Sequence, residues 1–190
     1  MSLMTKKRQI QTKLDSLYTT RKDLIIKVDR VAYIREIIRT GSALQIDWAC
    51  LDLSGMCAHK MRFYYQSAEY ANLTNGSYQN SRFGKSIFTG SDCSESDFTN
   101  CSFQMGIFSD SKFINSCLKG ADLRQAFFLN VDFSEADLTK ADLRGCRVVG
   151  SKFNRTDLRG ANIEGVEFTD CEMDFIKIDM QQKNELMNLS

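Results

Sequence analysis

Apolar side chains recur at every fifth position along most of this chain. Residues 46–180 divide without a slip into 27 consecutive units of five. In most units a small or apolar residue is followed by a polar residue, a large apolar residue and two polar or small residues, as in Ala121–Gln125 (ADLRQ). The central positions, from Trp48 to Ile178, carry no charged residue. A unit this short cannot bury its own apolar residue, so the units must stack on one another.

A period of five fits neither a continuous helix nor a flat strand. An α-helix repeats about every 3.6 residues and a strand about every two. Within one unit the two inward residues lie two apart, as on a short strand, and the remaining residues can form a corner. Proline is absent from the chain, which agrees with a need for backbone N–H groups in ladders between coils. The pattern therefore predicts an all-β solenoid.

The units resemble the A(D/N)LxX motif of the pentapeptide-repeat family, most strictly over residues 121–165. The resemblance covers residues 46–180 and implies a right-handed quadrilateral parallel β-helix with four fives per coil. The repeats then make about seven coils, and a strand spacing of about 4.8 Å gives a rod roughly 30 Å long. We expect an N-terminal segment at 1–45, the β-helix at 46–180 and a C-terminal tail at 181–190.

Residues 1–45 follow another pattern, with apolar residues at three- and four-residue spacing that indicates amphipathic α-helix. Thr20 and Asp23 resemble a helix start and Gly41 a stop, so the pattern fits either two helices, at 6–18 and 21–40, or one. An open solenoid end needs protection, and we expect this segment to cap the first coil. Helix-mediated dimerisation and docking on a partner or a membrane surface are the alternatives.

Residues twenty apart are expected to share a face, because one coil takes twenty residues. One face then carries an apolar strip on an otherwise polar surface, formed by Ile87, Ile107, Phe127, Leu129 and Val149. A contiguous exposed apolar patch usually marks a contact. We therefore predict that this strip is a protein-binding site. The chain's own N-terminal helix, a second copy or another protein could occupy it.

The reactive side chains form no catalytic motif. His59 is the only histidine, and the chain has no glycine-rich phosphate loop and no metal-ligand spacing. Seven cysteines without a Cys-x-x-Cys pair argue against a disulfide framework or a zinc site. Aspartates recur with the repeat, so we expect solvated or turn-bonded carboxylates. We expect no enzymatic activity, no cofactor and no metal.

The cysteines fall into two groups in the five-residue register. Burial is expected for the four at inward positions, which are Cys93, Cys101, Cys146 and Cys171. Outward or corner positions hold the other three, which are Cys50, Cys57 and Cys117.

Charge is divided unevenly along the chain. Residues 1–45 carry ten Lys and Arg against four Asp and Glu, net +6, whereas residues 46–180 carry fourteen against nineteen, net −5. The basic segment is not by itself a nucleic-acid signature, and we expect no direct nucleic-acid binding. The sequence holds no apolar stretch long enough to span a membrane. No long apolar run follows the first charged residues, so we expect no secretory signal and a cytoplasmic protein.

These observations predict a non-enzymatic protein-interaction module. The family resemblance implies two alternatives: a DNA-mimicking binder of DNA gyrase that protects it from quinolones, and a bacterial effector delivered into host cells. The first needs an acidic column. Its best candidate is the series Cys57, Ser77, Asp97, Cys117, Asp137 and Asp157, beside which lie Lys119 and Arg159. A net charge of −5 over the rod is weak beside duplex DNA, which carries about one charge per 1.7 Å.

Overall fold

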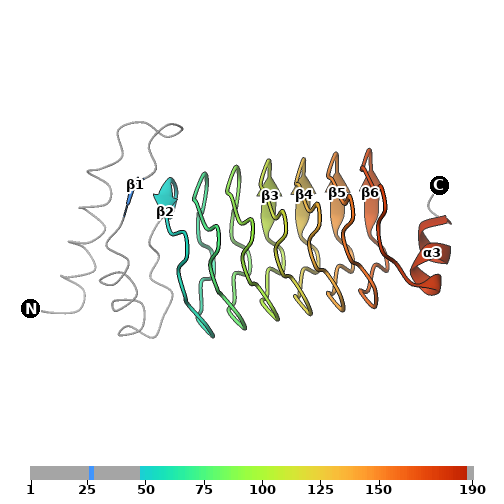
Figure 1. The fold of residues 1–190 in the computed structure, drawn as a ribbon, viewed down its shortest axis with the longest axis horizontal. Helices are drawn as coiled ribbons and strands as arrows, with labels where there is room; N and C mark the ends of the chain where they lie inside the picture. Colours follow the sequence, from blue (N-terminus) through green and yellow to red (C-terminus); the bar gives the residue numbers. More distant parts are fainter. Residues whose placement is uncertain (1–25, 28–47, 188–190) are drawn as a thin grey trace, which may run out of the picture.

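In the computed structural model, which describes residues 26–27 and 48–187, the repeats wind into an elongated rod of stacked coils (Figure 1). Backbone bridges join residues twenty positions apart, from the pair Asp52 and Asn72 to the pair Asp157 and Lys177. All of these bridges are parallel. One coil therefore takes four units of five, and each unit forms one side of the rod.

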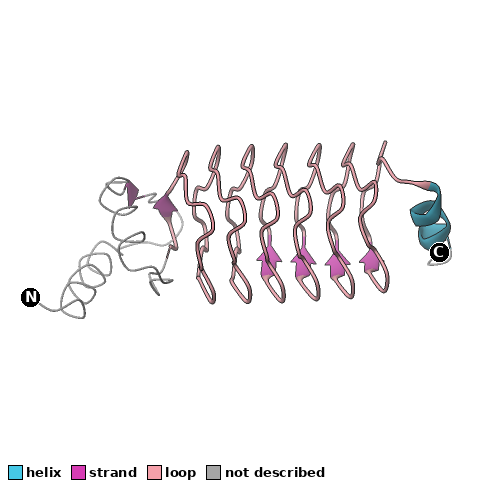
Figure 2. Cartoon of the chain, turned by 90° about the horizontal axis from the view of Figure 1, so that it is seen from below, coloured by secondary structure: helices cyan, strands magenta, loops and turns pink. Residues whose placement is uncertain are grey.

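One side of the rod holds the longest strands, which stack as a four-stranded parallel sheet in the order β3-β4-β5-β6 (Figure 2). These strands are β3 (Ile107–Ser109), β4 (Phe127–Leu129), β5 (Arg147–Val149) and β6 (Glu167–Thr169). Residues 67–69 and 87–89 occupy the same side in earlier coils, where bridges link Ser67 to Ile87 and Ile87 to Ile107. We call this side the strand face.

The chain turns each corner through left-handed backbone. The last residue of every five, from Cys50 to Phe175, has a positive φ between 53° and 71°, and only seven of these residues are glycine. Most turns close with a hydrogen bond such as that from Ala121 N–H to the Leu118 carbonyl, 3.0 Å long. A positive φ at the third residue is the mark of a type II turn.

The core is a set of side-chain stacks along the rod axis. Every central residue from Trp48 to Ile163 is buried, which confirms the inward assignment. Phe83 and Phe103, twenty residues apart, stack with ring centroids 5.1 Å apart and planes 12° apart. Because the register places like positions above one another, each large residue packs on its counterpart in the next coil.

Three turns contain a serine hydroxyl from the next coil. Met61 N–H donates to Ser81 Oγ at 2.9 Å, and Ser81 Oγ–H donates to the Ala58 carbonyl at 2.8 Å. Ser86 and Ser96 do the same in two other turns. The hydroxyl lies between the donor and the acceptor that close the other turns directly. A buried serine therefore satisfies both groups and joins two coils.

At the first coil, β1 (Ile26–Lys27) pairs in parallel with β2 (Leu51–Asp52), and Ile26 lies opposite Leu51. The prediction of helix over residues 21–40 is wrong at these two residues, because they are extended and pair with the rod instead of with their own helix. The rest of that prediction and the helix predicted at 6–18 lie outside the described residues. The pairing gives the first described strand a neighbour.

The segment for which the sequence predicts a C-terminal tail contains a helix, α3 (Met180–Met187), at the end of the rod. Its start is a capping box: Gln182 N–H donates to Asp179 Oδ1 at 3.0 Å, and Asp179 N–H donates to Gln182 Oε1 at 2.8 Å. The buried Gln182 amide also donates to the Leu158 and Ala161 carbonyls. The helix thereby satisfies backbone acceptors at the open end of the solenoid.

Candidate interaction surface

The structure brings the five predicted strip residues together on the outer side of the strand face. Ile87 pairs with Ile107, Ile107 with Phe127, and Leu129 with Val149. Phe127 and Leu129 belong to the same strand, β4, and flank the buried Phe128. Successive strand residues point to opposite sides, so the burial of Phe128 sends both neighbours outward. We call these five residues the apolar strip.

The apolar strip is partly covered by its own neighbours and partly open. Ile107 is 42% exposed, and the other four side chains are half-buried. At the C-terminal end of the strip, the Arg147 guanidinium lies 5.9 Å from the centroid of the Phe127 ring. Arg147 also lies 4.0 Å from Glu167, and both side chains are mostly exposed. The strip thus combines aliphatic residues with an aromatic ring beside a cation, a composition enriched at protein interfaces.

A row of side chains borders the strip at the corner where the chain enters the strand face. We call this row the leading corner, and its members are Tyr65, Lys85, Met105, Gln125, Gly145 and Gly165. Tyr65 is 64% exposed and Met105 is 45% exposed. The Lys85 ammonium lies 5.5 Å from the Tyr65 ring centroid. The sequence pattern did not single out these residues, although their twenty-residue spacing could have placed them beside the strip.

The aspartates next to the central residues serve the turns. Asp122 Oδ1 accepts the backbone N–H of Arg124 at 3.3 Å, and Asp142 Oδ1 accepts that of Arg144 at 3.2 Å. The same bond from the residue two positions later recurs at Asp52, Asp92, Asp97, Asp132, Asp137 and Asp157. The expectation of turn-bonded carboxylates is therefore confirmed at these positions, and none of them needs a catalytic explanation.

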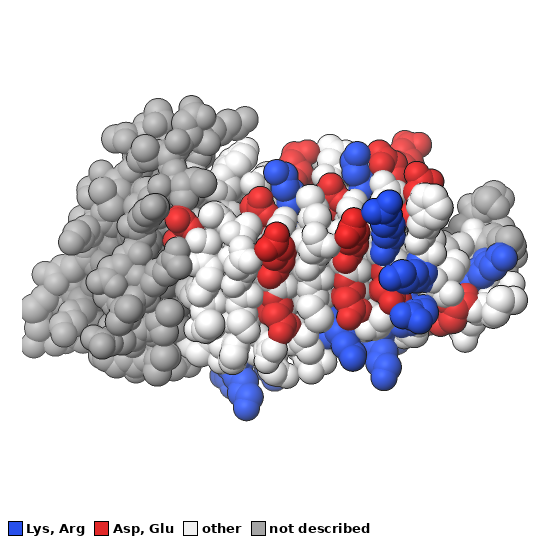
Figure 3. Space-filling view, viewed as in Figure 1, with Lys and Arg blue, Asp and Glu red and all other residues white. Residues whose placement is uncertain are grey.

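Arginines pair with three of the turn aspartates. Arg124 lies 2.8 Å from Asp122, Arg144 lies 2.7 Å from Asp142, and Arg159 pairs with Asp157 at 2.6 Å. The hydrogen bond from Arg124 holds the pKa of the Asp122 carboxyl below its usual value. Figure 3 shows acidic and basic side chains interspersed on the side in view. The candidate acidic column carries aspartate only at 97, 137 and 157, and Asp157 is paired with Arg159, so it is not the continuous negative column that a duplex-like rod requires.

His59 has a neighbour that the sequence did not reveal. Its Nε2 atom lies 2.7 Å from Ser77 Oγ on the next coil, although the two residues are eighteen positions apart and not twenty. A serine beside a histidine is the start of a nucleophile–base pair, but a third group must orient the imidazole. The nearest carboxylate of that column, Asp97, accepts hydrogen bonds from Thr99 and Gln79 instead. His59 is exposed, so the described residues build no enclosed site around the pair.

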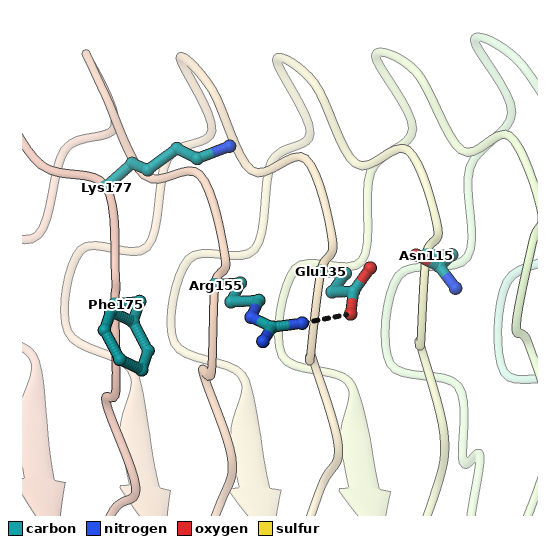
Figure 4. Close-up of a pocket in the computed structure, with 5 residues that line it drawn as sticks. All are labelled: Asn115, Glu135, Arg155, Phe175 and Lys177. Carbon is teal, nitrogen blue, oxygen red and sulfur yellow. Dashed lines mark hydrogen bonds and ion pairs between the residues drawn. The ribbon is translucent and has the colours of Figure 1, made fainter.

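An open groove of about 450 Å³ follows another corner of the rod (Figure 4). Arg155 and Glu135 form an ion pair of 3.4 Å within it, and Phe175 and Lys177 lie at one end. Phe175 is 82% exposed. The groove is open and its one carboxylate, Glu135, is paired with Arg155, so it does not resemble an active site.

The cysteines follow the register with two exceptions. Cys93, Cys101 and Cys146 are buried as predicted, and burial raises the pKa of the Cys101 and Cys146 thiols to about 12. Such thiols are inert because almost no thiolate is present at neutral pH. Cys171 is only half-buried, since it lies in the last coil, and Cys50 is buried although it occupies a corner.

The described residues contain no group of three or more His, Cys, Asp and Glu side chains arranged to hold a metal ion. Over residues 26–27 and 48–187, no helix has the length and apolar character that crossing a bilayer requires.

The stacked coils and the side-chain stacks inside them define a β-solenoid built from five-residue units. The family model for pentapeptide repeats (8 copies) matches residues 69–104, 107–145, 116–155 and 136–174, which together cover more than half of the chain. This chain belongs to the pentapeptide-repeat family, whose fold is a right-handed quadrilateral β-helix. The resemblance drawn from the repeat motif is confirmed.

Solved structures similar to this chain are also pentapeptide-repeat proteins. A trypsin-treated form of QnrB1, a plasmid-mediated fluoroquinolone resistance protein, is 19% identical, with 72% of this chain and 90% of that chain covered and a TM-score of 0.33. Rfr23 from the cyanobacterium Cyanothece is 17% identical, with coverages of 67% and 91% and a TM-score of 0.28.

A protein of the Arabidopsis thaliana thylakoid lumen is 25% identical, with coverages of 73% and 76% and a TM-score of 0.23. No curated protein matches this sequence significantly. Similarities of this size transfer no function to the chain.

Proposed function

We propose that this protein is a non-enzymatic protein-interaction module, a rigid β-helix that presents the apolar strip to a protein partner. The observation that carries the proposal is the continuity of the strip. Three successive strand positions, at Ile87, Ile107 and Phe127, are apolar and pair directly with one another on an outer surface. Outward positions on a solvated sheet are normally polar, and an exposed apolar row costs solubility unless a partner covers it.

Other parts of the rod provide the comparison. Ile114 is also a half-buried apolar residue at an outward position, on the side of the rod that follows the strand face along the chain. Its neighbours twenty residues before and after are Ser94 and Ser134. A single outward isoleucine is ordinary surface, whereas a row of them is a candidate contact. Ile114 is therefore the matched control position for the strip.

The two alternatives draw no specific support from the described surface. A DNA-mimicking gyrase binder needs an acidic column, but Asp122, Asp142 and Asp157 each carry an arginine partner. For a bacterial effector delivered into host cells, no residue of the rod supplies a distinguishing feature. The proposed protein-interaction function rests on the strip alone and requires neither of these more specific roles.

The test is recovery of partners from a native lysate of the source cells with three tagged proteins: the parent, Phe127→Asp and Ile114→Asp. A charge buried without a partner at a contact is strongly unfavourable, so Phe127→Asp should lose a protein that the parent recovers. Ile114→Asp should retain that protein. Loss with both variants, or with neither, would contradict the proposal.

A second assay separates the gyrase alternative. Purified gyrase should supercoil DNA at the same rate, and remain equally sensitive to a quinolone, with and without this protein. Restoration of supercoiling in the presence of a quinolone would replace the proposed function by that alternative.

A further inference from the structure

The leading corner differs in size between its two halves. Its N-terminal half carries the large exposed side chains of Tyr65, Lys85 and Met105, whereas Gly145 and Gly165 lie in its C-terminal half. A Cβ atom at Gly145 would meet nothing nearer than Gln125 Cγ, at 3.8 Å. The border of the strand face is therefore raised at one end and flat at the other.

The two ends also differ in charge. Lys85 has no carboxylate partner within the described part of the chain; its ammonium contacts only Tyr65, whose hydroxyl lies 3.4 Å away. At the other end stands Glu167, whose side chain is 75% exposed and touches Arg147 only at 4.0 Å. A surface pair of this kind contributes little, so Glu167 remains available to a second cation.

Phe127 lies midway between these charges. Glu167 follows Phe127 by two coils through the pairs Phe127–Arg147 and Arg147–Glu167. Lys85 precedes it by about two coils, since the bridges from Phe127 lead back through Ile107 to Ile87. A two-fold axis that crosses the rod at Phe127 would therefore exchange the heights of Lys85 and Glu167.

We propose that the strand face is the interface of an antiparallel homodimer, in which the two Phe127 side chains meet near the two-fold axis. Lys85 of each copy then faces Glu167 of the other copy, and Met105 lies over the flat corner at Gly145. This inference rests on the proposed function, because it requires the apolar strip to be a contact surface, and it names a second copy of this chain as the occupant.

Size and charge complementarity both favour the antiparallel arrangement. A closed two-fold interface must be complementary to itself, so a raised end that carries Lys85 needs a flat end that offers a carboxylate, such as Glu167, at the mirrored height. A parallel arrangement would instead bring equal heights together and set the leading corner of one copy against the opposite corner of the other, so Lys85 would lie about four coils from the other copy's Glu167. Apolar side chains on both sides of the axis would be removed from water together.

The test measures the dimer dissociation constant of the full chain by analytical ultracentrifugation. The parent should sediment as a dimer. Lys85→Glu and Glu167→Lys should each weaken dimerisation by roughly tenfold or more, because each substitution acts twice in a symmetric interface. The double variant should recover most of the loss, since it restores opposite charges with the order reversed. Phe127→Asp should be monomeric, and Ile114→Asp should remain a dimer.

The outcomes separate this inference from the proposed function. A parent that is monomeric at high micromolar concentration overturns the dimer, and the proposed function still stands if Phe127→Asp loses a protein partner. Two weak single variants without recovery in the double variant overturn the antiparallel pairing. Increased proteolysis of residues 1–47 in Phe127→Asp, without any change in sedimentation, would show that the chain's own N-terminal segment is the occupant.

Discussion

Substitution by glycine should stabilise the protein at a corner of the β-helix and destabilise it one residue before the corner. Lys140 has a φ of 59°, and Gly145, at the next corner, has a φ of 65°. A left-handed backbone costs an ordinary residue about 1–2 kcal/mol relative to glycine. Glycine gives back about 0.4–1 kcal/mol through the greater entropy of its unfolded chain. Lys140→Gly should therefore stabilise the protein, and Gly145→Ala should destabilise it, each by about 0.5–1 kcal/mol.

These two sites isolate backbone strain from packing. Lys140 forms no ion pair with any described residue, and a Cβ at Gly145 would have ordinary van der Waals contact with Gln125. For a chain of this size, the change should shift the melting temperature by about 1–4 °C. Urea unfolding, followed by the fluorescence of the buried Trp48, gives an independent value.

The neighbouring residue provides the control. Thr139 precedes Lys140 in the same turn and has no positive φ. Thr139→Gly should destabilise the protein by about 0.5–1 kcal/mol, because glycine there only adds freedom to the unfolded chain. If Lys140→Gly destabilises the protein as much as Thr139→Gly does, then the corners store no strain and the reasoning is wrong.

Four further changes test the core, the turns and the surface. Phe113→Ala should lower the free energy of unfolding by about 3–5 kcal/mol in denaturant melts, because it leaves a cavity in the aromatic stack. Ser81→Ala should cost about 1–3 kcal/mol in the same melts by leaving the Met61 N–H and the Ala58 carbonyl without their shared hydroxyl. The hydrogen bond from Arg144 lowers the pKa of Asp142. The stabilisation from this bond is therefore present above the unfolded pKa of about 3.9 and is lost as pH falls through the folded pKa. Asp142→Asn should flatten the dependence of the melting temperature on pH in that window. His59→Ala should leave partner recovery unchanged, and loss of an activity in the folded variant would count against the non-enzymatic proposal.

The sequence predicted the stacking of the rod because its period is uninterrupted. Knowing that residues twenty apart share a side was enough to place Ile107 beside Phe127 and to recognise the strip. The identity of the corner residues gave only a partial signal: glycine, asparagine and aspartate, which tolerate left-handed backbone, hold 14 of the 26 corners, whereas lysine, glutamate and other residues hold the rest. Tertiary hydrogen bonds to the next coil impose that conformation, as at Lys140, whose N–H donates to the Arg159 carbonyl.

Contacts between coils that do not follow the twenty-residue spacing were harder to foresee. The pair of His59 and Ser77 depends on side-chain direction and not on register. The two described residues of the N-terminal segment are extended because they pair with β2, which overrides their helical pattern. Asp179 and Gln182 at the start of α3 did carry a readable signal, because aspartate followed three residues later by glutamine fits a capping box.

Because parallel bridges join residues twenty apart, the side of the rod on which a residue lies depends on its position within the twenty-residue coil. Inserting five residues, such as one duplicated repeat, would keep the core pattern but rotate everything beyond it by a quarter turn. The halves of the apolar strip would then lie on different sides of the rod, although each coil could still fold. Only insertions or deletions of twenty residues, or of a multiple of twenty, change the length of such a rod and keep its surfaces in line, so a working interface restricts growth of the gene to whole coils.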